Sequence, residues 1–180
     1  MCGIVGAASR KNIVEVLIEG LRRLEYRGYD SCGFAVMNGD DAKHPIERAR
    51  TTARVSELAE QGKDFHGTLG IAHTRWATHG EPNDANAHPH YSYSQNLAII
   101  HNGIIENYST LKKNLQKKGY EFHSDTDSEV FVNFIEDIKK ETGCKLEEAV
   151  RLAMQEVIGA YAIVLMTKDD PTQLIAARKG

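Results

Sequence analysis

Helical and strand patterns alternate along this chain, and this alternation limits the folds it can adopt more than any other feature. Apolar residues at helical spacing predict helices at 14–24, 111–119, 130–138 and 146–157. Short β-rich runs bounded by Gly, Asn and Asp predict strands at 4–8, 33–37, 69–74, 97–101, 161–166 and 173–177. A mixed α/β layer fold fits this order, but periodicity does not choose the strand topology.

Two local signals refine the boundaries. Thr126 stands three residues before Glu129, ahead of an apolar helical run, and this spacing predicts a capping box with Thr126 as N-cap. The polar stretch 38–48, which contains Gly39 and Pro45, predicts a surface loop rather than a domain linker.

Composition narrows the class of protein. The chain has 180 residues and 41% apolar content, which suits one domain with a layered core. A net charge of -3 argues against nucleic-acid binding. The longest apolar run, 160–166, is too short to span a bilayer, no leader precedes Cys2, and the three cysteines show no disulfide spacing. We therefore expect a cytoplasmic protein that binds neither nucleic acid nor membrane.

Cys2 follows the initiator methionine, so removal of Met1 would place a thiol and a free α-amine on one residue. Their ordinary pKa values are about 8.5 and about 7.7 to 8.0, so a neutral amine can take the thiol proton near neutral pH. Cys2 would then be a nucleophile that carries its own base. The run that follows, Gly-Ile-Val-Gly-Ala-Ala, equally suits a buried strand that begins at a small apolar cysteine, and the hexapeptide leaves both interpretations open.

Polar residues gather in four short runs between the apolar segments, where a packed core has no need of them. These runs are Arg-Arg-Leu-Glu-Tyr-Arg-Gly-Tyr-Asp-Ser at 22–31, Ala-His-Thr-Arg-Trp-Ala-Thr-His-Gly at 72–80, His-Asn-Gly-Ile-Ile-Glu-Asn at 101–107 and Ser-Asp-Thr-Asp-Ser-Glu at 124–129.

With Cys2 and these runs in this order, the chain resembles the class II glutamine amidotransferase domains over essentially all of its length. Tyr26, Tyr29 and Trp76 favour the branch that aminates a sugar phosphate over asparagine synthetases and phosphoribosyl amidotransferases. The resemblance implies an α+β fold, the four-layer αββα sandwich of N-terminal nucleophile hydrolases, with two antiparallel sheets between helical layers.

The resemblance also implies an activity. Residues 1–180 would form a glutaminase domain that converts L-glutamine to L-glutamate and ammonia through a cysteine thioester, without metal or cofactor. Sugar-isomerase domains outside this chain would bind fructose 6-phosphate and receive the ammonia. We expect the isolated domain to be a monomer and the longer protein to be a homo-oligomer.

Four residues match the family's catalytic positions. Cys2 would attack the amide carbon, Asn102 and Gly103 would form the oxyanion hole, and Arg27 would lie close to the amine of the nucleophile. Asn-Gly is also typical of a tight hairpin turn after the 97–101 strand, and the two interpretations are compatible.

Five further residues match the family's substrate pocket. Arg75 would bind the α-carboxylate of glutamine, Asp127 its α-ammonium, and Trp76, Thr78 and His79 would line the pocket. The alternatives are a surface ion pair for Arg75, core packing for Trp76, and a favourable first-turn position in a helix for Asp127.

The histidines fit no zinc-binding spacing, so we predict no metal site. We expect His88 and His90 to shape a loop over the pocket, and His101 to support Asn102. Two rival functions stay open. One is a glutaminase serving another acceptor, such as phosphoribosyl pyrophosphate, and the other is a catalytically silent domain that retains Met1.

Overall fold

The computed structural model describes residues 1–39 and 46–180. Its helices are α1 (Val14–Leu24), α2 (Val55–Gln61), α3 (Tyr108–Lys117), α4 (Asp127–Thr142) and α5 (Leu146–Glu156). Its strands are β1 (Gly3–Ala8), β2 (Ser31–Met37), β3 (Glu47–Thr51), β4 (Leu69–Arg75), β5 (His90–Tyr91), β6 (Leu97–Gly103), β7 (Tyr161–Thr167) and β8 (Asp170–Lys179). Within these two ranges, no helix is both long and apolar enough to cross a membrane.

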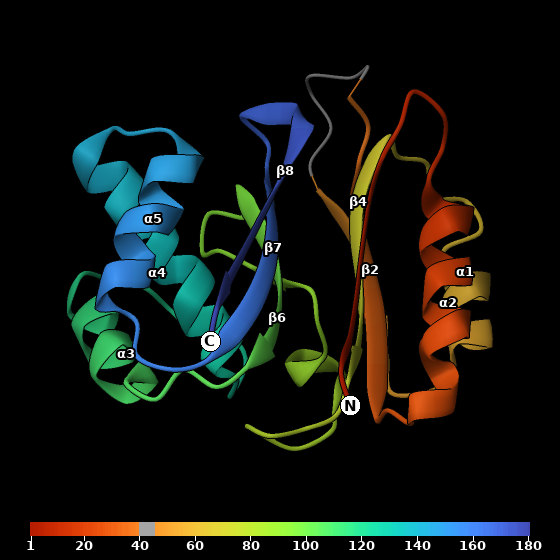
Figure 1. Cartoon of the computed structure of the whole chain (residues 1–180), viewed down its shortest axis with the longest axis horizontal. Coiled ribbons are helices and arrows are strands. Elements are labelled where there is room, and N and C mark those ends of the chain that lie inside the picture. The colour runs from red at the N-terminus through yellow and green to blue at the C-terminus, as the bar shows by residue number, and fades with distance from the viewer. Residues whose placement is uncertain (40–45) are drawn as a thin grey trace.

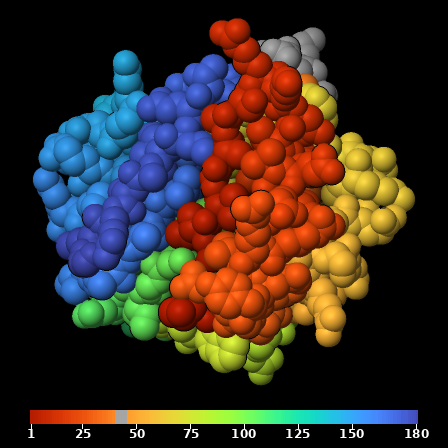
Figure 2. Space-filling view, turned by 45° about the vertical axis from the view of Figure 1, so that its right-hand side comes forward, coloured from red at the N-terminus to blue at the C-terminus, as the bar shows by residue number. Residues whose placement is uncertain are grey.

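The strands form two antiparallel sheets, one in the order β1-β4-β2-β3 and the other in the order β5-β6-β7-β8. The sheets face each other, with α1 and α2 covering one outer side and α3, α4 and α5 the other (Figure 1). The first and last strands, β1 and β8, lie side by side (Figure 2). The predicted four-layer αββα sandwich is confirmed.

Strand alternation builds a separate core on each face of a sheet. In β2, Phe34 and Val36 pack with the α1 and α2 side, while Ala35 and Met37 join the core between the sheets. The cause is the two-residue period of a strand, which sends successive side chains to opposite faces.

The second sheet follows the same rule. In β6, Leu97 and Ile99 pack toward α4 and α5, whereas Ala98 and Ile100 face the first sheet. The parity of a strand residue therefore decides whether it meets a helix or the space between the sheets. That space contains the site described below.

All the predicted helices and strands are present within a few residues of their expected limits, but α2, β3 and β5 were not predicted. The seven residues of α2 and the two of β5 give too short a pattern for periodicity to detect. The β3 strand contains Glu47, Arg48 and Arg50, and as an edge strand it needs little apolar surface. The predicted loop 38–48 is therefore wrong for its last two residues, and its central part, 40–45, lies outside the described residues.

The start of α4 contains one of the two hydrogen bonds that the predicted capping box requires. Thr126 is the N-cap, and its Oγ1 accepts the Glu129 N–H at 3.3 Å. The Glu129 carboxylate, however, accepts the backbone N–H groups of His123 and Ser124 rather than that of Thr126. The Thr126 N–H instead donates to Ser124 Oγ. These contacts fix segment 123–126 against the first turn of α4.

Candidate active site

Cys2 directly precedes β1 and lies on the same strand face as Ile4, which packs into the core between the sheets. The half-buried Cys2 Sγ accepts the backbone N–H of Trp76 at 3.1 Å and lies 3.6 Å from the Trp76 carbonyl oxygen. This N–H holds the sulfur in a defined position beside the turn at Trp76.

Asp30 organises the turn that supplies this N–H. Its Oδ2 accepts the backbone N–H of Ala77 at 2.6 Å, and its own N–H donates to the Arg75 carbonyl at 2.8 Å. These two bonds fix the chain on both sides of Trp76. The role of Asp30 was not predicted from the sequence, although this residue belongs to the first polar run.

Asn102 faces the first sheet from β6 and meets His73 of β4. The Asn102 Oδ1 lies 2.7 Å from His73 Nε2, and because an amide oxygen only accepts, Nε2 carries the proton. The other end of the amide, Nδ2, donates to the Cys2 carbonyl at 3.3 Å. His73 thus sets the direction of the Asn102 amide, with the N–H end toward Cys2.

The prediction that His101 supports Asn102 is wrong. Neighbouring strand residues point to opposite faces, so His101 points toward α4, where its Nδ1 lies 2.7 Å from Ser128 Oγ. A parity argument along 97–103 and 69–75 could have directed attention to His73. Nothing local in the sequence showed that β4 faces β6.

Gly103 ends β6 with a φ of 118°, and a Cβ built on it would lie 2.2 Å from the Ala160 carbonyl oxygen. A side chain is therefore excluded by both backbone conformation and contact. The predicted hairpin turn at Asn-Gly is wrong, because β6 continues through Gly103, which pairs with Tyr161 of β7.

Arg75, the last residue of β4, is buried rather than part of a surface ion pair. Its guanidinium donates to backbone carbonyls of the following loop, those of His79, Gly80 and Glu81. Burial lowers the pKa of Arg75, while the charges of Asp30 and Asp127 act in the opposite direction. The loop thus closes around a cation at the edge of the site.

Asp127 is the first residue of α4 and is buried. Its Oδ2 accepts the backbone N–H of Ile105 at 2.8 Å and lies 3.6 Å from His79 Nδ1. Its Oδ1 lies 3.9 Å from His101 Nδ1, beyond hydrogen-bond distance. The carboxylate is held in place through one oxygen, while the other retains acceptor capacity.

Trp76 is 55% exposed, so the core-packing interpretation is wrong. Its ring lies over Gly28, where an added Cβ would be 3.2 Å from the indole. Thr78 is also exposed. Arg27 is half-buried, and its Nη2 lies 3.6 Å from Met1 Sδ.

These elements enclose a cavity of about 210 Å³. A water molecule occupies about 30 Å³ of liquid, so the cavity has room for a small organic molecule. All the predicted site residues line it except Asn102 and Arg27. Segments distant in sequence, from the N-terminus to the start of α4, meet here.

His88 and His90 are buried, so they do not form an exposed loop over the pocket as predicted, although His88 lines the cavity. The chain passes between the sheets at this point because Gly33 has no Cβ, which would lie 2.1 Å from the His88 carbonyl oxygen. His88 Nε2 contacts Ser128 Oγ at 2.7 Å, and His90 Nε2 contacts Thr126 Oγ1 at 3.1 Å.

The buried imidazole of His88 contacts those of His73 and His90. The ring centroids of His73 and His88 are 4.2 Å apart, and those of His88 and His90 are 4.6 Å apart. Burial lowers the pKa of all three, to about 3 for His73, and so keeps them neutral. Within residues 1–39 and 46–180, no group of three or more His, Cys, Asp or Glu side chains is arranged to hold a metal ion.

Two solved structures share this fold. Glutamine phosphoribosylpyrophosphate amidotransferase from B. subtilis aligns with a TM-score of 0.80 and 24% identity, covering 99% of this chain and 37% of that one. An allosteric regulatory enzyme of purine biosynthesis aligns with a TM-score of 0.82 and 26% identity, with the same coverage. Fold and site together define an amidotransferase domain of the N-terminal nucleophile type.

Residues 73–179 match the family described as glutamine amidotransferase domain. The chain belongs to this family, in its class II. Two relatives are the isomerizing glutamine–fructose-6-phosphate aminotransferases of Bacteroides thetaiotaomicron, 55% identical, and Chlorobaculum tepidum, 50% identical. Each match covers 100% of this chain but only 29% and 30% of the relative, so the chain spans less than a third of their length.

Proposed function

We propose that residues 1–180 form the glutaminase domain of a glutamine–fructose-6-phosphate aminotransferase, and that the domain hydrolyses L-glutamine to L-glutamate and ammonia. The observation that carries this proposal is the position of Cys2 Sγ in a small cavity, with the Asn102 amide directed at the same residue. Neither metal nor cofactor is required for the steps below.

Cys2 is the proposed nucleophile, acting after removal of Met1, which is 70% exposed. The freed α-amine takes the thiol proton, and the sulfur attacks the side-chain amide carbon of glutamine. The amine then passes that proton to the departing ammonia, leaving a γ-glutamyl thioester that water cleaves to glutamate. The Trp76 N–H, 3.1 Å from the sulfur, holds the attacking atom in place. Arg27, beside Met1, would act near the new amine.

Asn102 and Gly103 are the proposed oxyanion hole. The Asn102 Nδ2 bond to the Cys2 carbonyl is long, at 3.3 Å, so this donor can turn to the oxygen that becomes negative. His73 holds the opposite end of the amide at 2.7 Å and thereby acts as a positioning residue.

Arg75 and Asp127 are the proposed clamps for the charged end of glutamine. Both border the cavity, Arg75 as a buried cation and Asp127 as a buried carboxylate. The α-carboxylate would bind the Arg75 donors left by the loop carbonyls, and the α-ammonium would bind Asp127. Trp76, Thr78 and His79 would enclose the rest of the substrate.

Fructose 6-phosphate is the proposed ammonia acceptor, bound by parts of the longer protein outside this chain. The 55% and 50% identity to two sugar-phosphate aminotransferases supports this acceptor over phosphoribosyl pyrophosphate, whose amidotransferase is 24% identical. We also propose a cytoplasmic protein, with the isolated domain a monomer and the longer protein a homo-oligomer.

Intact mass spectrometry before and after exposure to 6-diazo-5-oxo-norleucine tests the glutaminase proposal. We expect a mass lacking one methionine and a single adduct that maps to Cys2. A chain that retains Met1 and forms no adduct would support the silent-domain alternative for that preparation. A processed chain that still forms no adduct at Cys2 would overturn the proposal.

A further inference from the structure

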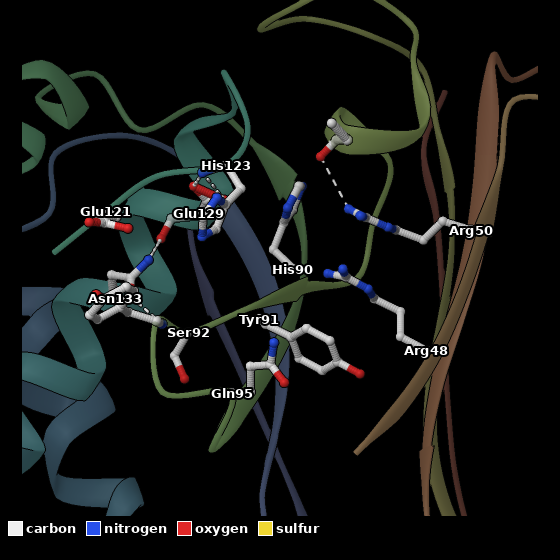
Figure 3. A pocket seen from close by; sticks show the side chains of 12 residues that line it. Arg48, Arg50, His90, Tyr91, Ser92, Gln95, Glu121, His123, Glu129 and Asn133 are labelled. Atoms are coloured by element: carbon white, nitrogen blue, oxygen red, sulfur yellow. Dashed lines mark hydrogen bonds between the residues drawn. The ribbon is translucent and has the colours of Figure 1, made fainter. Parts of the chain in front are cut away.

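A second cavity, of about 190 Å³, lies beyond the first turn of α4 (Figure 3). The first cavity is lined by 126–128, and the second by Glu129 and Asn133 of the same helix. His90, which lines the second cavity, contacts Thr126 of the first through its Nε2. The two cavities are thus neighbours, but none of the residues assigned to glutamine hydrolysis lines the second one.

One end of this cavity is cationic. Arg48 and Arg50 are two residues apart on β3, so their side chains extend from the same face of the strand, and Figure 3 shows both reaching toward His90. The guanidinium of Arg48 donates to the Pro89 carbonyl at 3.2 Å and lies 4.1 Å from the centre of the Tyr91 ring. These contacts hold the planar group in a defined orientation.

Arg50 is held in a similar way, by bonds from Nη1 to the Ala85 and Ala87 carbonyls at 3.1 and 3.0 Å. Each guanidinium has five N–H donors, and its bonds to described residues involve only Nη1. In the part of the chain that the structure describes, no carboxylate lies within ion-pair distance of either one.

The desolvation of this pair favours an anionic ligand. Both side chains are half-buried, and burial lowers the pKa of each. For Arg50 the pKa falls to about 10, and the neighbouring charge of Arg48 is the second cause. The charges of Glu129, on both arginines, and of Asp84, on Arg50, act in the opposite direction, but neither carboxylate lies within ion-pair distance. Two adjacent, partly desolvated cations with no described carboxylate in contact gain more from an anion than exposed cations do.

The opposite end of the cavity is acidic. Glu129 is buried, and its Oε1 accepts the His123 N–H at 2.7 Å and the Ser124 N–H at 3.3 Å, while Oε2 lies 3.3 Å from the His123 nitrogen. Glu121 is exposed and has no hydrogen-bond partner among the described residues. Figure 3 places both carboxylates on the side opposite the arginines. Acceptors at this end suit an ammonium group.

We propose that this cavity is a second binding site, for a small zwitterion. The phosphate or carboxylate of the ligand binds Arg48 and Arg50, and its ammonium binds Glu121 and Glu129. Amino sugar phosphates and α-amino acids both have this charge separation, and both are small. The site is independent of the glutaminase proposal, because it uses different side chains.

The arginines also tether segment 85–89 to β3, and this structural task by itself would account for the Nη1 bonds. This tethering does not require the carboxylates of Glu121 and Glu129 across the cavity. Glu121 therefore gives the cleanest test, because an exposed side chain without hydrogen bonds can change without affecting folding.

The experiment is an NMR titration of the full chain with four probes: glucosamine 6-phosphate, L-glutamate, fructose 6-phosphate and inorganic phosphate. The Nε–H resonances of Arg48 and Arg50 report this cavity whether or not a ligand occupies the cavity of Cys2. We expect saturable shifts with glucosamine 6-phosphate or L-glutamate at concentrations of about 1 mM. The stronger of these two probes identifies the anionic group as phosphate or carboxylate.

Two variants decide the outcome. Glu121→Gln should lower the affinity for the zwitterionic probe by about tenfold, because the ammonium contact is lost. The affinities for fructose 6-phosphate and phosphate should stay unchanged, because these probes have no ammonium group. Arg48→Gln, with its folding checked by thermal unfolding, should lower the affinity for all four probes by about tenfold or more. The proposal is overturned if no probe shifts the arginine resonances, or if Glu121→Gln leaves zwitterion affinity unchanged.

Discussion

The space between the two sheets has an apolar half and a polar half, and the same strands supply both. Residues facing the opposite sheet are Leu69, Ile71, His73 and Arg75 along β4, and Ala98, Ile100 and Asn102 along β6. The strand period is unbroken across the change from apolar to polar. A catalytic site can therefore be built into a sandwich by changing side-chain chemistry at one end, without changing the fold.

The two halves differ in what they contribute. The apolar half stabilises the fold by burying hydrocarbon, at about 25 cal/mol per Å². The polar half is destabilising unless each buried group has a partner, and within the described residues His73 Nδ1 and His88 Nδ1 have none. Stability should therefore come mainly from one half and chemistry from the other, and each prediction below tests this division.

Cys2→Ala should have the largest effect, lowering glutamine hydrolysis by about 10⁴-fold or more while the chain stays folded. The assay is ammonia release from L-glutamine. Cys144→Ala is the matched control, since Cys144 is also free and half-buried but lies outside the cavity. Residual turnover in Cys2→Ala at the level of the control would rule out Cys2 as the nucleophile.

Asn102→Ala should lower kcat by about 10² to 10³, with a smaller change in KM, because the oxyanion donor acts mainly in the transition state. Steady-state kinetics on processed protein measures both constants. An unchanged kcat would remove Asn102 from the oxyanion hole. A parallel thermal unfolding curve separates this loss from unfolding.

His73→Phe should lower kcat by about 10- to 100-fold, less than the loss of the donor itself, because the Asn102 amide remains but is free to rotate. His73→Gln retains an N–H donor and should recover part of the rate. Both variants should keep a nearly unchanged KM for glutamine. Equal kcat values for wild type and both variants would contradict the positioning role.

Acid should destabilise the polar half first. Burial lowers the pKa of His73 to about 3, while an unfolded histidine titrates near 6.5, so below about pH 6.5 the unfolded chain binds protons that the folded chain excludes. The stabilising contribution of each such histidine should be fully present above that pH. Below it, the free energy of unfolding should fall by about 1.4 kcal/mol per pH unit for each such histidine, down to about pH 3 for His73.

Urea unfolding between about pH 6 and about pH 5 measures this slope in a range above most carboxylate titrations. His73→Phe should reduce the slope by about 1.4 kcal/mol per pH unit, the contribution of one proton. An identical slope in the variant would show that His73 is protonated in the folded chain.

Ile100→Val in the apolar half should have the smallest effect. Removal of one buried methylene should lower the free energy of unfolding by about 0.5 to 1.5 kcal/mol. Because Ile100 lies among apolar residues between the sheets, kcat should stay within about twofold of wild type. Urea unfolding and the ammonia assay measure the two quantities. A large loss of kcat would contradict the assignment of stability to the apolar half and chemistry to the polar half.

Much of the local structure was predictable because it depends on neighbours in sequence. The 14–24 helix has the predicted limits, since its buried side chains repeat at helical spacing, and Thr126 is the predicted N-cap of α4. Edge strand β3 was not predictable, since Arg48 and Arg50 give it no apolar alternation.

The sequence by itself determined the periods of helices and strands and the residue types available for chemistry, including Cys2 and the polar runs. The tertiary structure decided the partners. It paired Asn102 with His73 rather than with the adjacent His101, enclosed Arg75 in loop carbonyls, and directed Asp30 at the turn beside Cys2. The physical reason is that sequence period fixes which residues share a strand face, whereas only the packing of two sheets fixes what that face meets.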